Sequence, residues 1–256
     1  MSDERLAGGF VNEVWRVGST VRRSTGPWTQ TVHALLRHLE AAGFAESPRV
    51  LGVDERGREV LTFLEGTVLD WTGWPHVMLA GDGVGQLGDL LRRYHEAVRG
   101  FQPPDDARWR NPLAPRAGEV VRHGDFSPFN TVWRGDRVVG LIDWDFAQPG
   151  PAISDLAYLA WYAVPLAGDR RACEYGFAGG VDRPLRLRTL CAAYGRTTPA
   201  EVVEEAVRII EAERVETLEL ARRGVEPWVR FAADGNPDAF AAEAAWISAN
   251  RRLLLG

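Results

Sequence analysis

The β-rich stretch at residues 119–146 most constrains what this chain can fold into, because the segments on either side of it look mostly helical. Within it the runs Val132–Arg134 and Arg137–Val139 flank Gly135-Asp136, a glycine-containing pair suited to a two-residue hairpin turn. We therefore expect two adjacent antiparallel strands that return the chain close to the point where it entered.

Polar side chains gather at the open end of this expected hairpin. Counting back from the turn places Asn130 opposite Leu141, so Asn130 and Asp143 emerge together, with Asp125 on the loop just before them. Two carboxylates and a carboxamide then converge, and an all-oxygen ligand set of this kind suits Mg²⁺ better than zinc. Asp125, five residues before the asparagine, is left to act as a base.

The composition indicates a globular chain that needs no covalent staple. Its 256 residues are 45% hydrophobic, and a chain of this length buries roughly three quarters of its unfolded surface. Cys173 and Cys191 form no CxxC pair, which argues against a disulfide scaffold and a cysteine-based zinc site. The net charge of -5 argues against a general nucleic-acid binder and against a partner of acidic membranes.

The chain contains no lysine, so all 30 basic residues are arginine. This excludes Schiff-base enzymes, pyridoxal-phosphate attachment and a P-loop of the Gly-Lys-Ser/Thr type. The N-terminal residues lack the pattern of a secretory signal, and no run reaches the ~18 apolar residues needed to span a bilayer. We therefore expect a cytoplasmic location and no membrane partner.

The organisation of the chain changes near residue 66. Before it, the pattern predicts the order β-β-α-β-β, with strands at 9–17, 20–23, 49–53 and 59–63 and a helix at about 31–42 that stops at Gly43. After it, helices are predicted at about 84–98, at 198–223 with a capping box from Thr198 and Glu201, and from Asn236-Pro237 toward Leu255.

Two further patterns each have a functional and a structural interpretation. Gly83–Gly88 matches the GxGxxG fingerprint of dinucleotide sites, but no second strand follows, so we interpret it as a helix start. Residues 201–219 carry seven glutamates, which either form an acidic wall for a cationic ligand or a solvated helix face. Arginines four residues after some of them favour the solvated face.

The spacing of His123, Asp125 and Asn130 followed by a downstream Asp143 is the catalytic-loop arrangement of kinases. The chain here resembles the aminoglycoside phosphotransferase family, through His123–Asn130, Ile142–Asp145 and Ser154–Ala157. The resemblance implies an α+β, protein-kinase-like bilobal fold. A small antiparallel-sheet lobe with one helix, residues 1–66, would bind nucleotide, and a larger helical lobe, residues 67–256, would hold the catalytic loop and the acceptor.

The resemblance also implies a role for each polar residue of the loop. Asp125 would orient or deprotonate a substrate hydroxyl, while Asn130 and Asp143 would hold Mg²⁺ against the phosphates of ATP. His123, together with Asp155, would brace the loop rather than react.

On the nucleotide side, the backbone after the last strand of the small lobe (Phe63, Leu64, Glu65 and Gly66) would be the hinge that reads the base. Gly9, with Gly8 and Asn12, would form the turn over the phosphates. The family places a lysine on the third strand to grip the phosphates. Here Arg22, with Arg23 as its rival, is the candidate replacement.

The chain also departs from the family in its acidic residues. The helix after the third strand should carry a glutamate partner for the strand cation, but its only glutamate, Glu40, lies near its C-terminal end. Asp145 stands where the family usually has glutamate.

The expected function is ATP- and Mg²⁺-dependent phosphorylation of a small-molecule hydroxyl. The segment between Asp143 and Asp155 is too short for the activation segment of a protein kinase, so a small acceptor is favoured over a protein. Aminoglycosides, macrolides, amino alcohols and sugars all remain open as acceptors, and GTP remains open as the donor. Two alternatives remain: a catalytically weak or inactive ligand-binding or immunity-type module, and a metal-dependent hydrolase that uses His123 and the aspartates.

Overall fold

The computed structural model describes residues 4–6, 14–70, 74–115, 117–177, 180–195 and 197–256. The chain forms two compact units, each made from two separate stretches of sequence. The first unit combines Met1–Asp70 with Leu90–Asp155, and the second combines Trp71–Asp89 with Leu156–Gly256. The division into functional lobes at residue 66 stays a prediction.

A five-stranded antiparallel sheet dominates the N-terminal part of the first unit. Its strands are β1 (Glu4–Arg5), β2 (Val14–Val17), β3 (Thr20–Ser24), β4 (Val50–Val53) and β5 (Arg58–Thr62), in the order β1-β2-β3-β5-β4. The predicted β-β-α-β-β order is confirmed for residues 14–62, and β1 was not predicted. The predicted strand residues 9–13 lie outside the described residues.

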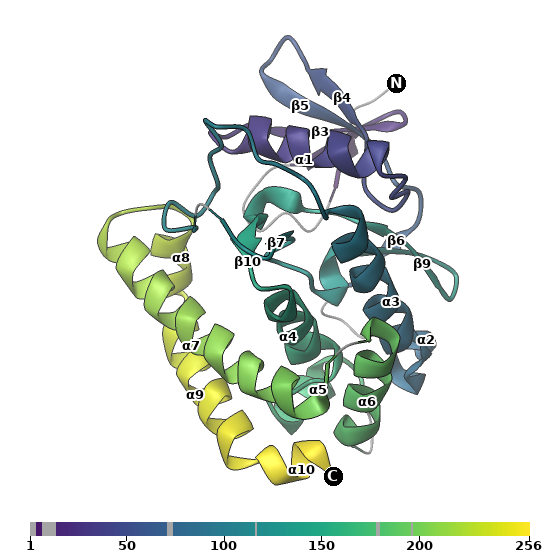
Figure 1. The fold of residues 1–256 in the computed structure, drawn as a ribbon, viewed down its shortest axis with the longest axis vertical. Helices are drawn as coiled ribbons and strands as arrows, with labels where there is room; N and C mark the ends of the chain where they lie inside the picture. Colours follow the sequence, from purple (N-terminus) through teal and green to yellow (C-terminus); the bar gives the residue numbers. More distant parts are fainter. Residues whose placement is uncertain (1–3, 7–13, 71–73, 116, 178–179, 196) are drawn as a thin grey trace. The chain divides into compact units, whose positions relative to one another are not determined.

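Helix α1 (Thr29–Ala41) follows β3 and lies along this sheet (Figure 1). The apolar residues predicted for its inner face are buried: Val32, Leu35, Leu36 and Leu39. The helix ends just before Gly43, whose φ of +79° is a left-handed conformation that costs glycine little.

The hairpin of residues 131–141 forms as the sequence predicts, with one shift in register. Its strands β8 (Thr131–Arg134) and β9 (Arg137–Leu141) join β6 (Thr67–Val68), and β7 (Val120–Arg122) pairs separately with β10 (Gln148–Gly150). Arg134 pairs with Arg137 as predicted, but a bulge places Thr131, not Asn130, opposite Leu141. The predicted pairing of Asn130 with Leu141 is therefore wrong by one residue, because a bulge adds one residue to β9.

The second unit is helical in its described residues. Two helices, α3 (Asp82–Ala97) and α4 (Ala152–Ala163), are divided between the two units. The helices wholly within the second unit are α2 (His76–Ala80), α5 (Asp169–Glu174), α6 (Arg183–Tyr194), α7 (Pro199–Arg222), α8 (Trp228–Ala233), α9 (Asn236–Ala249) and α10 (Arg251–Leu255). Helices α7 and α9 lie side by side (Figure 1). None of the helices in the described ranges is both long enough and apolar enough to cross a bilayer.

Two helix predictions can be checked at their ends. The capping box at the start of α7 is confirmed, since Thr198 Oγ1 accepts from the Glu201 N–H and Glu201 accepts from the Thr198 N–H. The single helix predicted from Asn236 to Leu255 is interrupted at Asn250. Asn250 ends α9 with φ -106° and ψ +16°, and both its backbone N–H, at 3.0 Å, and its side-chain amide, at 2.8 Å, donate to the Trp246 carbonyl.

The glycine pattern at 83–88 has a packing role. These glycines lie in the first turns of α3, and a Cβ on Gly88 would meet the Leu190 carbonyl oxygen of α6 at 2.9 Å. The glycine therefore allows close approach of two helices. The glutamates of α7 include Glu205, Glu211 and Glu219, which pair with arginines three or four residues later, as a solvated helix face would.

Candidate functional site

The loop after β7 is fixed by its backbone. Gly124 has a φ of +80°, and a Cβ at this position would meet the Phe146 carbonyl oxygen at 2.0 Å, so no other residue fits without a shift of the chain. The next residue, Asp125, is half-buried, and its carbonyl oxygen accepts from the Ser127 N–H at 2.8 Å and the Asn130 side chain at 2.9 Å. The loop thus places Asp125 and Asn130 beside one another.

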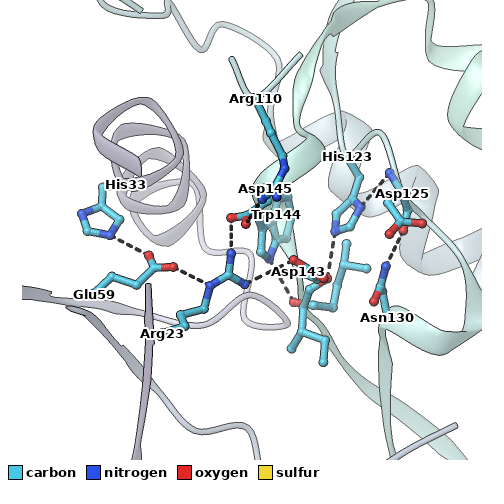
Figure 2. A network of polar contacts seen from close by, with 12 residues as sticks. Arg23, His33, Glu59, Arg110, His123, Asp125, Asn130, Asp143, Trp144 and Asp145 are labelled. Carbon is cyan, nitrogen blue, oxygen red and sulfur yellow. Dashed lines mark hydrogen bonds and ion pairs between the residues drawn. The ribbon is translucent and has the colours of Figure 1, made fainter. Parts of the chain in front are cut away.

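Asn130 presents one oxygen to the site. Its Nδ2 donates to the carbonyl of Asp125, which leaves Oδ1 as the side-chain atom with the character of a metal ligand. Its carbonyl oxygen accepts from the Ile142 N–H at 2.9 Å, so the hairpin hydrogen bonding continues to the residue just before Asp143. Asn130 and Asp143 therefore do emerge at the same end of the hairpin (Figure 2).

Asp143 adopts an unusual backbone conformation. Its φ of +62° and ψ of +67° lie in the left-handed region, which is sparsely populated by residues other than glycine, asparagine and aspartate. The conformation turns the chain sharply from β9 into the short 3₁₀ helix Trp144–Phe146. The Asp143 side chain is 44% exposed, whereas the nearby carboxylates of Asp145 and Glu59 are buried.

His123 is fully buried, and both of its ring nitrogens are engaged. Nδ1 accepts from the Asp125 N–H at 3.3 Å, so Nε2 carries the proton and donates to the Ile142 carbonyl at 3.1 Å. Burial lowers the pKa of His123 below its usual value, against the raising effect of nearby carboxylates such as Asp155. The neutral ring joins the loop of residues 123–130 to the end of β9, which fits the bracing role expected for it.

Asp155, at the start of α4, holds the same loop by hydrogen bonds to its backbone. Its carboxylate accepts from the backbone N–H groups of His123 at 2.7 Å and Gly124 at 3.0 Å, and it lies 3.2 Å from Nε2 of His95. Burial raises its pKa, but the hydrogen bond and charge of His95, together with other nearby groups such as Arg122, lower it below its usual value. The hydrogen-bonded loop is therefore held on a buried carboxylate.

The two candidate arginines of β3 point in different directions. Arg22 lies 3.9 Å from Asp54, whereas Arg23 is buried and directs its two terminal nitrogens at the aspartates after β9. Nη1 of Arg23 lies 3.2 Å from Asp143 Oδ1, and Nη2 contacts Asp145 (Figure 2). Arg23, and not Arg22, is the β3 arginine that meets the aspartates.

Two partners in this cluster were missed by sequence reasoning. Glu59 of β5 contacts Arg23, with Nε and Oε1 2.6 Å apart, although the acid was sought on the helix. Arg110, from the loop before β7, donates to Asp145 Oδ2 at 2.8 Å and stacks 4.4 Å from the ring of Trp28. The strand order could have suggested Glu59, but nothing in the sequence around Arg110 indicated its partner.

The residues predicted to read the base follow β5 directly. Phe63, Leu64 and Glu65 form no regular element, and the Arg16 guanidinium lies 3.8 Å from the Phe63 ring centroid and 2.5 Å from the Glu65 carboxylate. Their role as a hinge stays a prediction. Gly9, Gly8 and Asn12 lie outside the described residues.

The donor atoms at the open end of the hairpin fit a magnesium ion. They are the amide oxygen of Asn130 and the carboxylate of Asp143, which are oxygen ligands of the kind that Mg²⁺ prefers. Among the described residues no group of three or more His, Cys, Asp or Glu is placed to hold a metal. Mg²⁺ in proteins often keeps water and phosphate oxygens beside one or two protein ligands.

A sheet lobe with one helix, a His-Gly-Asp loop and a strand arginine facing the aspartates define a kinase-like phosphotransferase fold. A family comparison agrees: residues 3–119 and 106–190 match the phosphotransferase enzyme family, and the chain belongs to that family. The chain is also 41% identical over 201 residues to the trifolitoxin immunity protein of Rhizobium leguminosarum bv. trifolii, covering 76% of this chain and 75% of that protein.

Solved structures share the fold at low sequence identity. A choline/ethanolamine kinase family protein from Mesorhizobium loti is 21% identical, with a TM-score of 0.59 over 96% of this chain and 92% of that chain. The GDP complex of aminoglycoside 2'-phosphotransferase-IIIa is 15% identical, with a TM-score of 0.59 over 96% and 93%. Spectinomycin phosphotransferase, in complex with ADP and spectinomycin, is 12% identical, with a TM-score of 0.60 over 98% and 93%.

Proposed function

We propose that this protein transfers the γ-phosphate of ATP, with Mg²⁺, to a hydroxyl group of a small molecule. One observation carries the proposal. Asp125, Asn130 and Asp143 meet at one end of a single hairpin, and Arg23 of the third strand contacts Asp143. This is the set of side chains that phosphoryl transfer requires, which are a base, oxygen ligands for a cation and a fixed positive charge.

Each residue has a defined part in the transfer. Asp125 accepts the proton of the acceptor hydroxyl. At the same time the hydroxyl oxygen forms a bond to the γ-phosphorus, and the bond from that phosphorus to the ADP oxygen breaks. Asn130 and Asp143 would hold Mg²⁺, which supplies neutralisation of phosphate charge when bound. Arg23 would bind phosphate oxygens through the terminal N–H groups that its contacts with Asp143 and Asp145 leave over, and His123 would keep the loop in place.

The nucleotide and the acceptor are proposed at the level of chemical class. The segment Phe63–Glu65 would bind the base, and GTP is a second candidate donor because one structural relative was solved with GDP. The acceptor would be an aminoglycoside-like antibiotic, an amino alcohol or a sugar, since structural relatives include kinases of such classes.

The test is nucleotide binding followed by transfer. The thermal midpoint of the purified protein is measured with ATP, GTP and ADP, each with and without Mg²⁺, and a metal-dependent rise is expected for ATP. The Asp125→Asn variant should keep that rise, because the binding groups remain. It should lose transfer to any active acceptor by about 10²–10⁴-fold, the usual contribution of a general base. Transfer at the wild-type rate in this variant would remove the base assignment.

A second candidate is an immunity-type module that binds a toxin without efficient transfer. It is favoured by the identity of 41% to the trifolitoxin immunity protein and by the arginine that already occupies Asp143. Expression of the wild type and of Asp125→Asn in trifolitoxin-sensitive cells separates the two. Protection by both proteins supports binding alone, protection by the wild type only supports phosphorylation, and protection by neither removes this candidate.

A further inference from the structure

The chain lacks the helix glutamate that its family uses, yet its strand cation has a carboxylate partner. Helix α1 carries one acidic residue, Glu40, which lies 3.9 Å from Arg49. Glu59 of β5 instead stands directly opposite Arg23 in the β3–β5 register, so both side chains project from the same face of the sheet. We propose that Glu59, held by His33, is the positioning residue that sets Arg23 for nucleotide binding, an inference that rests on the proposed function.

The two oxygens of Glu59 have separate partners. Oε1 lies 2.6 Å from Nε of Arg23, and Oε2 lies 2.9 Å from Nε2 of His33 on α1. All three side chains are buried, with exposures below 10%. The carboxylate is held between an ion pair with Arg23 and a hydrogen bond with His33, and moving it would separate buried opposite charges.

The contact with Glu59 decides which part of Arg23 faces the site. Glu59 forms an ion pair at the Nε side of the guanidinium without a hydrogen bond to Nε, and the two terminal nitrogens lie on the other side, where they donate to Asp143 and Asp145 (Figure 2). Each terminal nitrogen carries two N–H groups, so a guanidinium in this position can keep its contacts with Asp143 and Asp145 and still offer N–H groups to phosphate oxygens. Helix α1 thus acts on Arg23 through His33 and Glu59.

The charges of the cluster leave room for a cation. Arg23 and Arg110 face the carboxylates of Glu59, Asp143 and Asp145, so this cluster of five side chains keeps one negative charge. Glu59 and Asp145 are buried, while Asp143 is half-exposed, so the excess charge faces solvent at the proposed ligand of Mg²⁺. Glu59 thus supplies a charge that holds Arg23 without taking a place at the cation.

The experiment measures the Kd for Mg²⁺–ADP by calorimetry in the full chain, so no acceptor is needed. Glu59→Gln should weaken binding about tenfold or more, since a charge-assisted contact of this kind is lost. His33→Gln keeps a hydrogen-bond donor for Glu59, so its Kd for Mg²⁺–ADP should be close to that of the wild type. His33→Leu keeps only the packing of the side chain, so its Kd should rise as much as that of Glu59→Gln. Arg58→Gln is the matched control on the same strand and should leave the Kd unchanged.

A double-mutant cycle separates positioning from folding. In an Arg23→Met background, Glu59→Gln should cause no further loss of affinity, because Glu59 acts through Arg23. Equal losses from Glu59→Gln in both backgrounds, or equal affinities of His33→Gln and His33→Leu, would overturn the inference. If Glu59→Gln does not fold, the His33 pair decides. If the wild type does not bind Mg²⁺–ADP, both the proposed function and this inference are wrong. If the wild type and all the variants bind equally tightly, this inference alone is wrong.

Discussion

Asp143 is the residue at which backbone conformation and chemistry meet. Its left-handed φ and ψ turn the chain out of β9, and its half-exposed carboxylate faces both Arg23 and solvent. Aspartate and asparagine tolerate this conformation through local hydrogen bonding, while other side chains strain it. The charge and the backbone role of this residue can therefore be separated by substitution.

Asp143→Asn and Asp143→Ala should both weaken the Mg²⁺–nucleotide complex, because each removes a carboxylate ligand. Only the alanine variant should also lose stability from backbone strain, by about 1–2 kcal/mol relative to the asparagine variant. Calorimetry with Mg²⁺–ADP and urea unfolding of both proteins measure the two effects. Equal stabilities would show that the left-handed conformation imposes no constraint at this position.

His123 gives the protein a dependence on pH in the mildly acidic range. Its pKa is lowered in the folded state by burial, while in the unfolded chain it lies near 6.5. Below about pH 6.5 the unfolded chain therefore binds a proton that the native state does not, so the free energy of unfolding falls as pH falls. Replacement by a group that does not titrate, as in His123→Asn, should flatten this slope in the range just below about pH 6.5. Urea unfolding across that range checks it, and an unchanged slope would assign the effect to other groups.

At the scale of elements, the clearest local signals in the sequence were confirmed, and these were the helix caps and turns. Thr198 and Glu201 form the capping box of α7, and Gly135, with a φ of +57°, forms the hairpin turn. Such signals depend on residues close in sequence, so a single sequence suffices to find them.

Features that depend on distant residues could not be predicted in the same way. The bulge in β9 shifts the pairing of Asn130, and a bulge is defined by how the strand pairs with its neighbour β8 rather than by the local residue pattern. The contacts of Glu59 with Arg23 and of Arg110 with Asp145 join residues 36 and 35 positions apart, respectively, as the numbering gives. Local patterns thus predicted the loop to which we assign the chemistry, while the contact between Glu59 and Arg23 could be found only from the register of β3 and β5.

The capping box offers a test at this scale. Thr198→Ala should lower the free energy of unfolding by about 1 kcal/mol, because the Glu201 N–H loses its acceptor at the start of α7. Thr189→Ala is the control, since its hydroxyl donates to the Leu185 carbonyl inside α6 and caps no helix end. Urea unfolding compares the two, and equal effects would contradict a specific role for the cap.

At the scale of the whole molecule, residues 1–66, the predicted nucleotide-binding lobe, form hydrogen bonds with residues later in the chain. Glu46 accepts from the Leu141 N–H at 2.7 Å, and His38 on α1 lies 3.0 Å from the Ala97 carbonyl. Both contacts lie within the first compact unit, which includes Leu90–Asp155. The folding unit of this part of the chain therefore extends beyond the residues that the sequence pattern grouped together.

A fragment of residues 1–66 should consequently fail to fold by itself. It keeps the sheet and α1 but loses the partners that residues 90–155 supply, and short units with incomplete cores are marginally stable. Circular dichroism during heating is expected to show no cooperative transition, whereas the full chain shows one. A sigmoidal transition in the fragment would show that the first lobe is an autonomous domain.

The contact of Arg23 with Glu59 also limits how this site can change over evolutionary time. Replacing Glu59 alone removes one of the three carboxylates around Arg23, and replacing Arg23 alone leaves Arg110 as the remaining arginine of the cluster, so each single change disturbs the balance of buried charges. A lineage that moves between this arrangement and a strand lysine with a helix acid must alter positions 23, 33 and 59 almost together. We therefore expect these three positions to be inherited as a set, so that they separate relatives with the arginine arrangement from those with the lysine one.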